Sequence, residues 1–356
     1  MDCPKKIPLT LFLIFSFIFS QCEDGEVEFW DLCYPIETTI VLNNPNEFST
    51  EFPIEICELI NLEVLNLNVM WGESNYLIGE IPDCIGDLQN LVELDLGWNA
   101  LYGELPGSIG NLTNLRSLNL LSNQFNGDIP QSIGNLINLT YLNFGYNHFE
   151  GSIPETIGNL TQLTELYFSE NQLEGSIPSS FGNLSELTMF SIYANQIGGE
   201  IPETIGNLIN LISINAAGNQ LSGNIPVGIG NLINLERLWL NYNNLSGSIP
   251  YSICNLENVN WSAYGFNGDD SYVNNNQLCP VYPDCIIDYI GEQDTLSCPE
   301  IHIGDTNGDG IINILDVVLV VNLILASEYN VFADLNEDGI LNVLDVVSII
   351  NIILQN

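Results

Sequence analysis

The sequence predicts an α/β solenoid, which is a row of similar coils stacked on one another, followed by a small all-α domain. Two columns of identical residues predict the coils, because glycine and asparagine each recur every 24 residues through the middle of the chain. A third observation predicts the small domain: an acidic loop pattern occurs twice near the C-terminus, 29 residues apart. With 356 residues, of which 46% are hydrophobic, the chain is long enough for several domains and a large core.

The N-terminus has the features of an export signal. Lys5 and Lys6 precede an apolar run over 9–19, which is too short to span a bilayer but has the length of a signal-peptide core. We therefore predict a signal peptide over 1–21, no transmembrane segment, and an extracellular location, either secreted or attached to a cell surface. At the C-terminal end of this signal peptide, the sequence allows either ordinary cleavage or lipidation of Cys22.

The charge balance excludes two classes of partner. The chain has 45 acidic and 4 basic residues, which gives a formal net charge of −41. Without the signal peptide, Arg116 and Arg237 are the only basic residues left. Nucleic acids and anionic membranes are therefore excluded as partners. A solvated acidic surface accounts for most of this charge, and clustered carboxylates that bind cations are the sharper interpretation.

Each 24-residue row predicts one coil. In the row from Gly110 to Ile133, Leu118 and Leu120 alternate as a short strand with inward side chains, and Asn123 can hydrogen-bond the turning backbone of neighbouring coils. A single coil cannot bury its leucines, so several must stack and both ends need caps. The asparagine column then forms an internal, structural ladder: Asn75, Asn99, Asn123, Asn147, Asn171, Asn195, Asn219, Asn243 and Asn267.

Cysteines before the repeats predict a capping structure. Trp30, Cys33 and the apolar stretch 39–42 look like a capping strand, and we pair Cys22 with Cys33. Loss of Cys3 with the signal peptide leaves eight cysteines, an even number that suits disulfides in an oxidising compartment.

The remaining cysteines predict a second cap after the repeats. The row after Cys254 is lengthened and closes at Cys279, about one turn away, so we pair Cys254 with Cys279 and Cys285 with Cys298. Cys57 and Cys84 lie at the start of neighbouring rows. They could be adjacent or could remain buried free thiols, and this choice stays open.

The repeat resembles a known family. The segment LxGxIPxxIGNL, seen from Leu221 to Leu232, looks like the plant-specific type of extracellular leucine-rich repeat, and the resemblance covers roughly two-thirds of the chain. The run NNQLCPVYPDC resembles the cysteine cap that follows such repeats. This resemblance implies a curved solenoid with a parallel sheet on its concave side.

The residues that flank the inward leucines predict a binding face, because successive strand residues point to opposite sides. Exposed Trp and Tyr combine apolar area with a hydrogen-bonding tip, which suits protein or sugar recognition. The alternative is an ordinary exposed sheet, on which Tyr is also common. The candidate ligand-binding residues are Trp98, Tyr141, Tyr146, Glu165, Tyr167, Tyr193, Arg237, Trp239, Tyr242 and Trp261.

The acidic loops predict two calcium ions. A hard cation needs oxygen ligands at alternating positions, a glycine for the sharp turn and a carboxylate that enters a helix, and both loops supply these. Helices predicted over 314–325 and 343–354 are too apolar to stand alone, so we expect them to pack on each other once metal is bound. The predicted ligands are Asp305, Asn307, Asp309, the carbonyl of Ile311, Asn313 and Asp316, then Asp334, Asn336, Asp338, the carbonyl of Ile340, Asn342 and Asp345.

The duplicated loops also resemble a family. Asp at the twelfth loop position, a helix on the C-terminal side only and the tandem arrangement look like a type I dockerin, a module that docks proteins onto cohesin domains outside the cell. The family's frequent hydroxyl or basic contacts are missing, so we expect a contact dominated by apolar side chains; the alternative is a calcium-stapled module without a partner. The resemblance implies cohesin contacts at Ile314, Leu315, Val343, Leu344, Asn322 and Asn351.

These observations predict a secreted adaptor that is not an enzyme. Its repeats would recognise a protein or glycan, and its dockerin-like domain would dock it to a cohesin-bearing scaffold. One alternative is a component of an extracellular polysaccharide-degrading system, since Glu93, Asp95 and Glu165 are carboxylates on one face. Another is an inhibitor or receptor-like recognition protein. The expected segments are a signal peptide (1–21), an N-terminal cap (22–58), the repeats with a C-terminal cysteine cap (59–298) and the dockerin-like domain (301–356).

Overall fold

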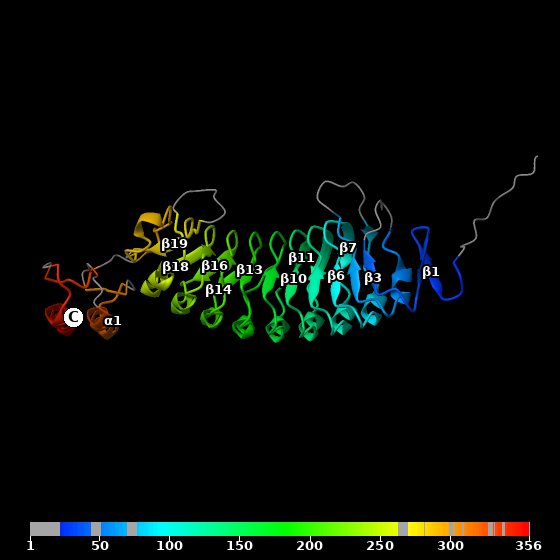
Figure 1. The fold of residues 1–356 in the computed structure, drawn as a ribbon. Coiled ribbons are helices and arrows are strands. Elements are labelled where there is room, and N and C mark those ends of the chain that lie inside the picture. Colours follow the sequence, from blue (N-terminus) through cyan, green and yellow to red (C-terminus); the bar gives the residue numbers. More distant parts are fainter. Residues whose placement is uncertain are drawn as a thin grey trace, which may run out of the picture.

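The computed structural model is a row of coils that ends in a helical module (Figure 1). The signal peptide, Asn75, Asn267, Asp309 and Asp338 lie outside the residues that the structure describes. The described residues are 22–43, 51–69, 77–262, 270–280, 282–298, 302, 304–307, 310–326, 330, 332–336 and 339–355.

The principal sheet carries one short parallel strand from each coil. Strand follows strand in chain order, and side chains at equivalent positions of adjacent coils lie opposite one another. Within the described residues the sheet consists of β3 (Val41–Asn43), β4 (Val64–Asn66), β6 (Glu93–Asp95), β8 (Ser117–Asn119), β10 (Tyr141–Asn143), β12 (Glu165–Tyr167), β13 (Met189–Ser191), β15 (Ser213–Asn215) and β17 (Arg237–Trp239).

A second lane of parallel strands follows the turn after each principal strand. The described part of this lane forms two sheets. One contains β5 (Ile78–Gly79), β7 (Ala100–Glu104), β9 (Gln124–Asp128) and β11 (His148–Glu150), and the other contains β14 (Gly198–Glu200), β16 (Gln220–Gly223), β18 (Asn244–Ser248) and β19 (Gln277–Cys279).

Short 3₁₀ helices line the opposite flank of the coils. A proline stands immediately before each of them, and its fixed φ starts the turn, as at Pro106 (φ −64°) and Pro154 (φ −67°). These helices are η1 (Ile54–Glu58), η2 (Asp83–Asp87), η3 (Gly107–Asn111), η4 (Gln131–Asn135), η5 (Glu155–Asn159), η6 (Ser179–Asn183), η7 (Glu203–Asn207), η8 (Val227–Asn231) and η9 (Tyr251–Asn255).

The glycine column allows the coils to approach closely at these 3₁₀ helices. A Cβ atom added to Gly110 would lie 2.5 Å from both the carbonyl oxygen and the Cβ of Ser132 in the next coil. That distance is too short for any side chain, so the 24-residue recurrence of glycine follows from the stacking of backbones. Ser132 closes the same gap from its own side, since its Oγ donates to the carbonyl of Gly107 at 2.7 Å.

One continuous apolar core runs along the solenoid. Leu118 and Leu120, the inward residues of one strand, are both 0% exposed, as are their counterparts in neighbouring coils. Phenylalanines fill the middle coils, where the rings of Phe144 and Phe168 lie 5.8 Å apart and those of Phe144 and Phe149 lie 5.2 Å apart. The core is therefore shared between neighbouring coils, as a stacked repeat requires.

The asparagine ladder joins each coil to the preceding one. Asn147 donates from Nδ2 to the carbonyl of Leu120 in the preceding coil at 2.9 Å, and its Oδ1 accepts from the backbone N–H of Phe125 at 3.1 Å. The same Nδ2 also lies within hydrogen-bonding distance of the carbonyls of Phe144 and Gly145 in its own turn. The residue before it, Tyr146, has a left-handed backbone (φ 56°), which these bonds hold in place.

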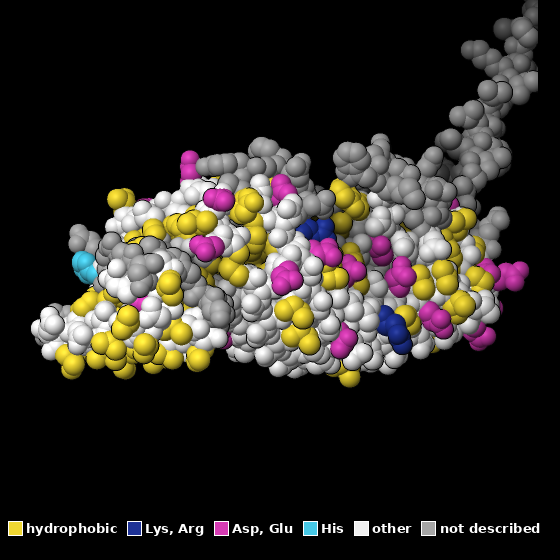
Figure 2. Space-filling model, turned by 60° about the vertical axis from the view of Figure 1, so that its left-hand side comes forward, with side chains coloured by type: hydrophobic (Ala, Val, Ile, Leu, Met, Phe, Trp, Pro, Cys, Tyr) yellow, Lys and Arg dark blue, Asp and Glu magenta, His cyan; other side chains and the backbone are white. Residues whose placement is uncertain are grey.

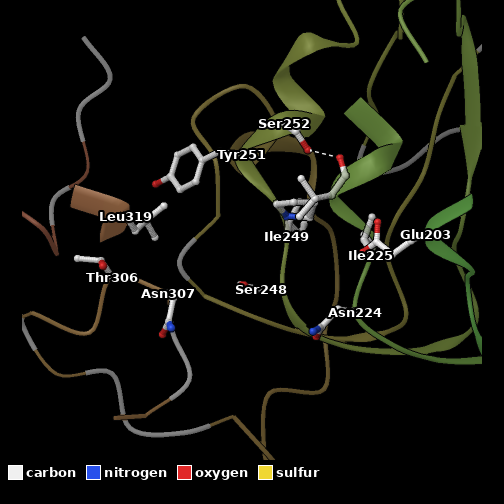
Figure 3. Close-up of a pocket in the computed structure, with 12 residues that line it drawn as sticks. Glu203, Asn224, Ile225, Ser248, Ile249, Tyr251, Ser252, Thr306, Asn307 and Leu319 are labelled. Carbon is white, nitrogen blue, oxygen red and sulfur yellow. Dashed lines mark hydrogen bonds between the residues drawn. The ribbon is translucent and has the colours of Figure 1, made fainter. Parts of the chain in front are cut away.

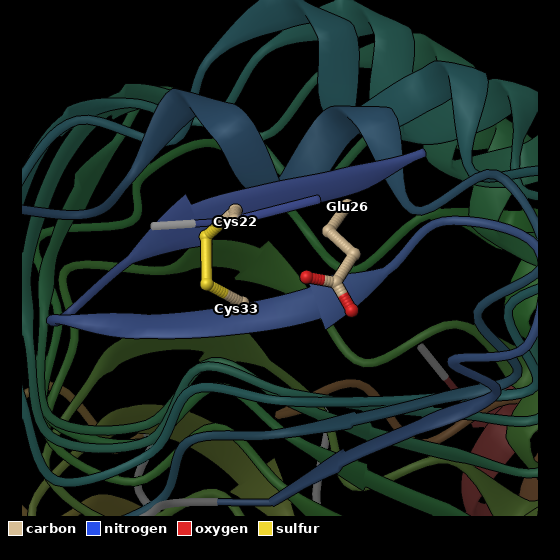
Figure 4. A group of neighbouring side chains, drawn as sticks. All are labelled: Cys22, Glu26 and Cys33. Carbon is tan, nitrogen blue, oxygen red and sulfur yellow. A yellow bond between two sulfur atoms is a disulfide. The ribbon is translucent and has the colours of Figure 1, made fainter. Parts of the chain in front are cut away.

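The N-terminal cap is a two-stranded hairpin of β1 (Glu26–Phe29) and β2 (Leu32–Pro35), and β3 then joins the principal sheet. Cys22 and Cys33 form a disulfide, which is the pair chosen from the sequence. The sulfur of Cys22 is therefore engaged and not free for lipidation. Glu26 lies beside this disulfide (Figure 4), but the three side chains do not form a metal site, since both sulfurs are bonded to each other.

Cys57 and Cys84 are also joined, which resolves the choice that the sequence left open. Their disulfide connects η1 to η2 in the next coil.

The predicted pairing in the C-terminal cap is wrong. The structure joins Cys254 to Cys285 and Cys279 to Cys298. The reason is the length of the last coil: Ser248 pairs with Cys279 in the second lane, 31 residues later, whereas Ser222 pairs with Asn244 after 22 residues. The nine extra residues leave Cys279 in the second lane beside Ser248, away from Cys254 in η9. The chain then passes through Cys285 and η10 (Ile287–Tyr289).

The C-terminal module consists of two helices, each of which follows one acidic loop. They are α1 (Ile314–Ala326) and α2 (Val343–Gln355), which end one residue beyond the predicted limits. Val320 and Ile349 are 0% exposed in their shared core. In the described part of the chain, no helix is both long and apolar enough to cross a bilayer.

Candidate functional site

The strand face, which we define as the solvent side of the principal sheet, carries two aligned columns of side chains. Strand pairing places the predicted residues in register from one coil to the next. The first column is Glu93, Ser117, Tyr141, Glu165, Met189, Ser213 and Arg237, and the second is Asp95, Asn119, Asn143, Tyr167, Ser191, Asn215 and Trp239.

The N-terminal part of the strand face is a network of amides around carboxylates. Asp95 accepts from Nδ2 of Asn119 at 2.9 Å and from Nδ2 of Asn68 at 3.1 Å. Glu93 accepts from Nδ2 of Asn66 at 3.1 Å. These acids are bound by neutral donors across adjacent coils, so they are held in fixed positions.

Two tyrosines and one glutamate occupy the middle of the face. Tyr167 donates to Glu165 at 2.8 Å, Asn143 donates to the hydroxyl of Tyr141 at 2.9 Å, and the two tyrosine rings lie 6.0 Å apart. Burial, followed by the hydrogen bond to Glu165, raises the pKa of Tyr167 well above its ordinary value. Burial also raises the pKa of Tyr141. Both rings are therefore neutral hydrogen-bonding groups at physiological pH.

The C-terminal end of the face contains residues that the sequence reasoning missed. Trp239 pairs with Tyr272, so Tyr272 takes the column position that the 24-residue spacing assigned to Ala263, which lies outside the described residues. Trp261 pairs with Ser271 instead. Asn276 is the sequence signal that could have identified Tyr272. Trp239 lies four residues before the ladder residue Asn243, and Tyr272 lies four residues before Asn276.

Asn276 shows that the ladder continues across the lengthened coil. Its Nδ2 donates to the carbonyl of Leu240 at 2.9 Å and its Oδ1 accepts from the N–H of Leu245 at 3.0 Å. It therefore has the role that the sequence reasoning assigned to Asn267, and that assignment is wrong. The extra residues before it bring Asp270 to the strand face, where it accepts from Nδ2 of Asn260 at 2.7 Å.

Four more predicted aromatic residues lie at the edge of the strand face, where each coil turns. Trp98, Tyr146 and Tyr242 have left-handed backbones with φ of 56°, 56° and 55°, one residue before a ladder asparagine. Tyr146 and Tyr242 are 56% and 60% exposed, and Tyr193, one position earlier in its coil, is 38% exposed. The ladder thus presents aromatic rings to solvent on a rigid backbone.

The two acidic loops share one hydrogen-bonding plan. Asp305 accepts from the N–H of Gly310 and Asp334 from that of Gly339, each at 2.8 Å. At the helix entrance, Asp316 accepts from the N–H groups of Thr306 and Asn313, both at 2.8 Å.

Asp345 repeats this arrangement in the second loop. It accepts from the N–H of Leu335 at 3.0 Å and from that of Asn342 at 2.9 Å. In both loops, the asparagine at the ninth position donates to the carbonyl at the seventh, from Asn313 to Ile311 at 3.1 Å and from Asn342 to Ile340 at 2.9 Å.

The donor set in these loops fits a calcium ion. Asp305, Asp316 and Asp345 are 0% exposed and Asp334 is 2% exposed, and the chain's two arginines outside the signal peptide are on the repeats. Buried carboxylates without a cation are costly, and a divalent ion offsets that cost. Asn307 and Asn336 follow two residues after the first aspartates, where further oxygen ligands are required. The predicted ligand roles stay predictions.

The outer surface of the helices is apolar and repeats with the 29-residue spacing of the loops. Ile314 and Val343 are 63% and 66% exposed, and Leu315 and Leu344 are 60% and 59% exposed. Asn322 and Asn351 are exposed at the same relative position. In Figure 2, hydrophobic side chains gather over this end of the molecule. The matched pairs of exposed apolar residues are Ile311 and Ile340, Ile314 and Val343, Leu315 and Leu344, Val318 and Val347, Val321 and Ile350, and Leu325 and Leu354.

Comparison with protein families identifies both parts of the chain. Residues 113–173, and separately residues 90–112, 210–232 and 234–256, match models of the leucine-rich repeat. The solenoid is therefore built of leucine-rich repeats. Residues 303–354 match the dockerin type I domain, so the paired loops and helices are a type I dockerin, a type of domain that binds calcium. None of these models describes a catalytic domain.

Leucine-rich-repeat proteins are among the solved structures similar to this chain. The ectodomain of the Arabidopsis thaliana receptor kinase GASSHO1/SCHENGEN3, in complex with CASPARIAN STRIP INTEGRITY FACTOR 2, is 37% identical with a TM-score of 0.59, over 64% of this chain and 26% of that one. The Arabidopsis receptor kinase HAESA, in complex with the peptide hormone IDA and the co-receptor SERK1, is 35% identical with a TM-score of 0.63, over 71% and 41%.

A bacterial structure is also similar. A leucine-rich-repeat protein of Leptospira interrogans is 32% identical with a TM-score of 0.50, over 67% of this chain and 61% of that one. This chain thus spans less than two-thirds of the length of all three solved proteins. Comparison with curated protein sequences gives no match.

Proposed function

We propose that this protein is an extracellular, non-enzymatic adaptor. Its leucine-rich repeats recognise a protein or glycan on the strand face, and its dockerin, folded by two calcium ions, docks the molecule onto a cohesin-bearing scaffold or cell surface. The observation that carries the proposal is the matched set of exposed apolar residues on two helices whose loops bury four carboxylates. We assign 1–21 to a signal peptide, 22–58 to the N-terminal cap, 59–298 to the repeats with their C-terminal cap, and 301–356 to the dockerin.

Calcium and the docking surface are linked through the helices. Bound calcium would supply the positive charge that holds each loop closed, while the loop aspartates orient the backbone at the start of α1 and α2. The predicted ligands outside the described residues, Asp309 and Asp338, belong to the same proposal. Without calcium, the buried carboxylates of each loop would repel one another and the starts of the two helices would not be fixed, so docking should require calcium.

The partner surface should be apolar and uncharged. The only charged residues within α1 and α2 are Asp316 and Asp345, and both are fully buried. Leu315 and Leu344 expose large aliphatic side chains that gain about 1.5–3 kcal/mol each on full burial. A second copy of this chain is a poor occupant, because two molecules with a formal charge of −41 each repel one another.

Replacement of both Leu315 and Leu344 by Asp should lower the affinity for a cohesin by roughly 100-fold or more, because two apolar anchors are lost and two charges must be desolvated. Both leucines are changed together because the matched helices offer two equivalent surfaces. Calorimetry of the full chain against a panel of cohesins, with calcium, measures the effect. Docking of the unchanged protein should weaken by no more than about threefold between low and high salt, since no ion pair contributes.

The matched control replaces Ile209 and Ile233 by Asp. These residues are 55% and 60% exposed on the flank of the repeats, so the change in charge and polarity is the same at a site away from the dockerin. Equal loss of affinity in the control, or no binding of the unchanged protein to any cohesin of the panel, would contradict the docking proposal.

The strand face supports recognition of a ligand rather than catalysis. Glu93, Asp95 and Glu165 are each bound by a neighbouring neutral donor. Similar solved ectodomains are in complex with CASPARIAN STRIP INTEGRITY FACTOR 2 and with the peptide hormone IDA. A polysaccharide-degrading assembly remains a second setting for the same adaptor, because a shared scaffold would place it among enzymes.

Replacement of Trp239 by Ala should reduce ligand binding about tenfold to 100-fold, because this partly buried ring lies between Asn215 and Tyr272 in its column of the strand face. Peptide and glycan arrays probed with the calcium-loaded full chain identify the ligand, and titration with it measures the change. Tyr102, 47% exposed in the second lane, provides the control as Tyr102→Ala. A ligand that binds both variants equally well does not use this face.

A further inference from the structure

The dockerin contacts the repeats through the side chains of Asn330 and Tyr251. Nδ2 of Asn330, in the connection between α1 and the second loop, donates to the hydroxyl of Tyr251 at 2.8 Å. Tyr251 is the first residue of η9 in the last regular coil. Asn330 is only 2% exposed, although it is a polar residue on a short connection. A buried side-chain amide in such a position requires partners for all of its hydrogen-bonding groups.

The orientation of the Asn330 amide is set by its other bonds. Its Oδ1 accepts from the N–H of Phe332 at 2.8 Å and from that of Ala333 at 3.2 Å. The oxygen therefore faces the second loop and the NH₂ group faces the repeats. The backbone carbonyl of Asn330 also accepts from the N–H of Asp334, the first ligand of the second predicted calcium site, at 3.2 Å. One residue thus bonds both the last coil and the start of a calcium loop.

The first loop lies against the same part of the repeats. A cleft of about 370 Å³ separates the two modules, and Thr306, Asn307 and Leu319 of the dockerin line it opposite Ile225 and Ile249 of the repeats. Figure 3 shows the Tyr251 ring extending from the repeats toward Leu319. Thr306 is itself bonded to Asp316 through its N–H and its hydroxyl. The first loop and the residue that precedes the second loop are therefore adjacent to the last two coils.

The connection between the modules is short and starts from a fixed point. Cys298 is bonded to Cys279, and the first loop ligand, Asp305, follows after seven residues (305 − 298). Seven residues reach at most about 25 Å. A tether of this length gives the intramolecular contact an effective concentration in the millimolar range or above, so a contact with a dissociation constant of about a millimolar is enough to hold the modules together.

We infer that the flank of the last two coils is a docking surface for the chain's own dockerin, and that calcium in the second loop and the contact between Asn330 and Tyr251 stabilise each other. The apolar pairs around Leu315 and Leu344 stay exposed in this arrangement. A partner bound there would be held at a defined orientation to the strand face. The contact itself does not depend on which partner binds, so it can hold or fail independently of cohesin docking.

The clean test is Tyr251→Phe, because Tyr251 belongs to the repeats and is no part of either loop. Loss of one hydrogen bond of about 1 kcal/mol predicts a calcium affinity of the full chain that is roughly threefold to tenfold weaker. Small-angle scattering of the calcium-loaded variant should also show a larger maximum dimension than the unchanged protein. Tyr242→Phe, which removes an exposed tyrosine hydroxyl elsewhere on the repeats, serves as the control.

A second variant separates the contact from the local turn. Asn330→Ala should weaken calcium binding in two ways, through loss of the bond to Tyr251 and through loss of the bonds within the turn before the second loop. In the Tyr251→Phe background the first loss has already occurred. The effect of Asn330→Ala should therefore be smaller there by the factor that Tyr251→Phe alone causes. Additive effects of the two substitutions would overturn the inference. Unchanged calcium affinity and scattering in Tyr251→Phe would overturn it as well.

Discussion

Replacement of Asp316 and Asp345 together by Asn is expected to leave the dockerin unfolded at calcium concentrations that saturate the unchanged protein. Each of these carboxylates closes its loop by accepting backbone N–H groups from both ends, and each is 0% exposed. An amide keeps one acceptor but turns an NH₂ group toward the N–H groups that the second oxygen bound. It also removes the charge that a hard cation needs.

The expected size of the effect is a calcium affinity at least about 100-fold weaker, because two charged ligands are lost in a site whose folding depends on them. Helical circular dichroism from α1 and α2 should require calcium in the unchanged protein and should be absent in the double variant. Chelation of calcium from the unchanged protein should give the same spectrum.

The control makes the same change in charge at two aspartates of the C-terminal cysteine cap. Asp284 and Asp288 are exposed there, and Asp284→Asn with Asp288→Asn removes the same two negative charges. This control should bind calcium normally. A helical signal that is equal with and without calcium would contradict the proposal that metal folds the dockerin.

Asn147→Ala is expected to destabilise the solenoid by about 3 kcal/mol or more. The substitution leaves the N–H of Phe125 buried without a partner, which costs about 1–3 kcal/mol. It also removes the 2.9 Å bond to the carbonyl of Leu120, which keeps a 3.2 Å bond from Asn123. The substitution further removes the bonds that hold the left-handed backbone at Tyr146, a conformation that costs about 1 kcal/mol for a residue other than glycine. Since neighbouring coils share one core, the loss should spread to both sides of the altered coil.

Thermal unfolding of the repeats measures this effect, with an expected decrease in the melting temperature of roughly 6–12 °C. Asn135→Ala is the matched control, because Asn135 is an exposed asparagine at the end of η4 in the same part of the chain. Asn147→Asp should be at least as harmful as Asn147→Ala, since its carboxylate would face three carbonyl oxygens. A melting temperature equal to that of the Asn135→Ala variant would show that the ladder is dispensable.

The regular coils could be predicted from the sequence because their contacts are local and periodic. The counterparts of Leu118 and Asn123 have equivalent partners in the regular coils that the structure describes, so one row predicts the inward leucines, the ladder and the columns of the strand face. The same reasoning predicted the two helices after the acidic loops to within one residue, since the loop motif fixes where each helix begins.

Prediction failed where the period is interrupted. Nine extra residues in the last coil move the ladder to Asn276, bring Tyr272 beside Trp239 and leave Cys279 away from Cys254. The spacing of residues in the sequence carries no information on the path of such an insertion. The contact between Tyr251 and Asn330 has a related origin: the residues are 79 positions apart and belong to different repeating patterns, so only the folded chain brings them together.

The parallel register of the coils has an evolutionary consequence. The side chain of each ladder asparagine bonds only the coil before it and its own turn, so a 24-residue unit can be gained or lost between the caps without any change in the kind of bond that joins the remaining coils. Each such event moves the dockerin by about one strand spacing, 4.7–4.9 Å, relative to the N-terminal cap. Gain or loss of whole coils would therefore change the distance between the N-terminal cap and the dockerin in uniform steps.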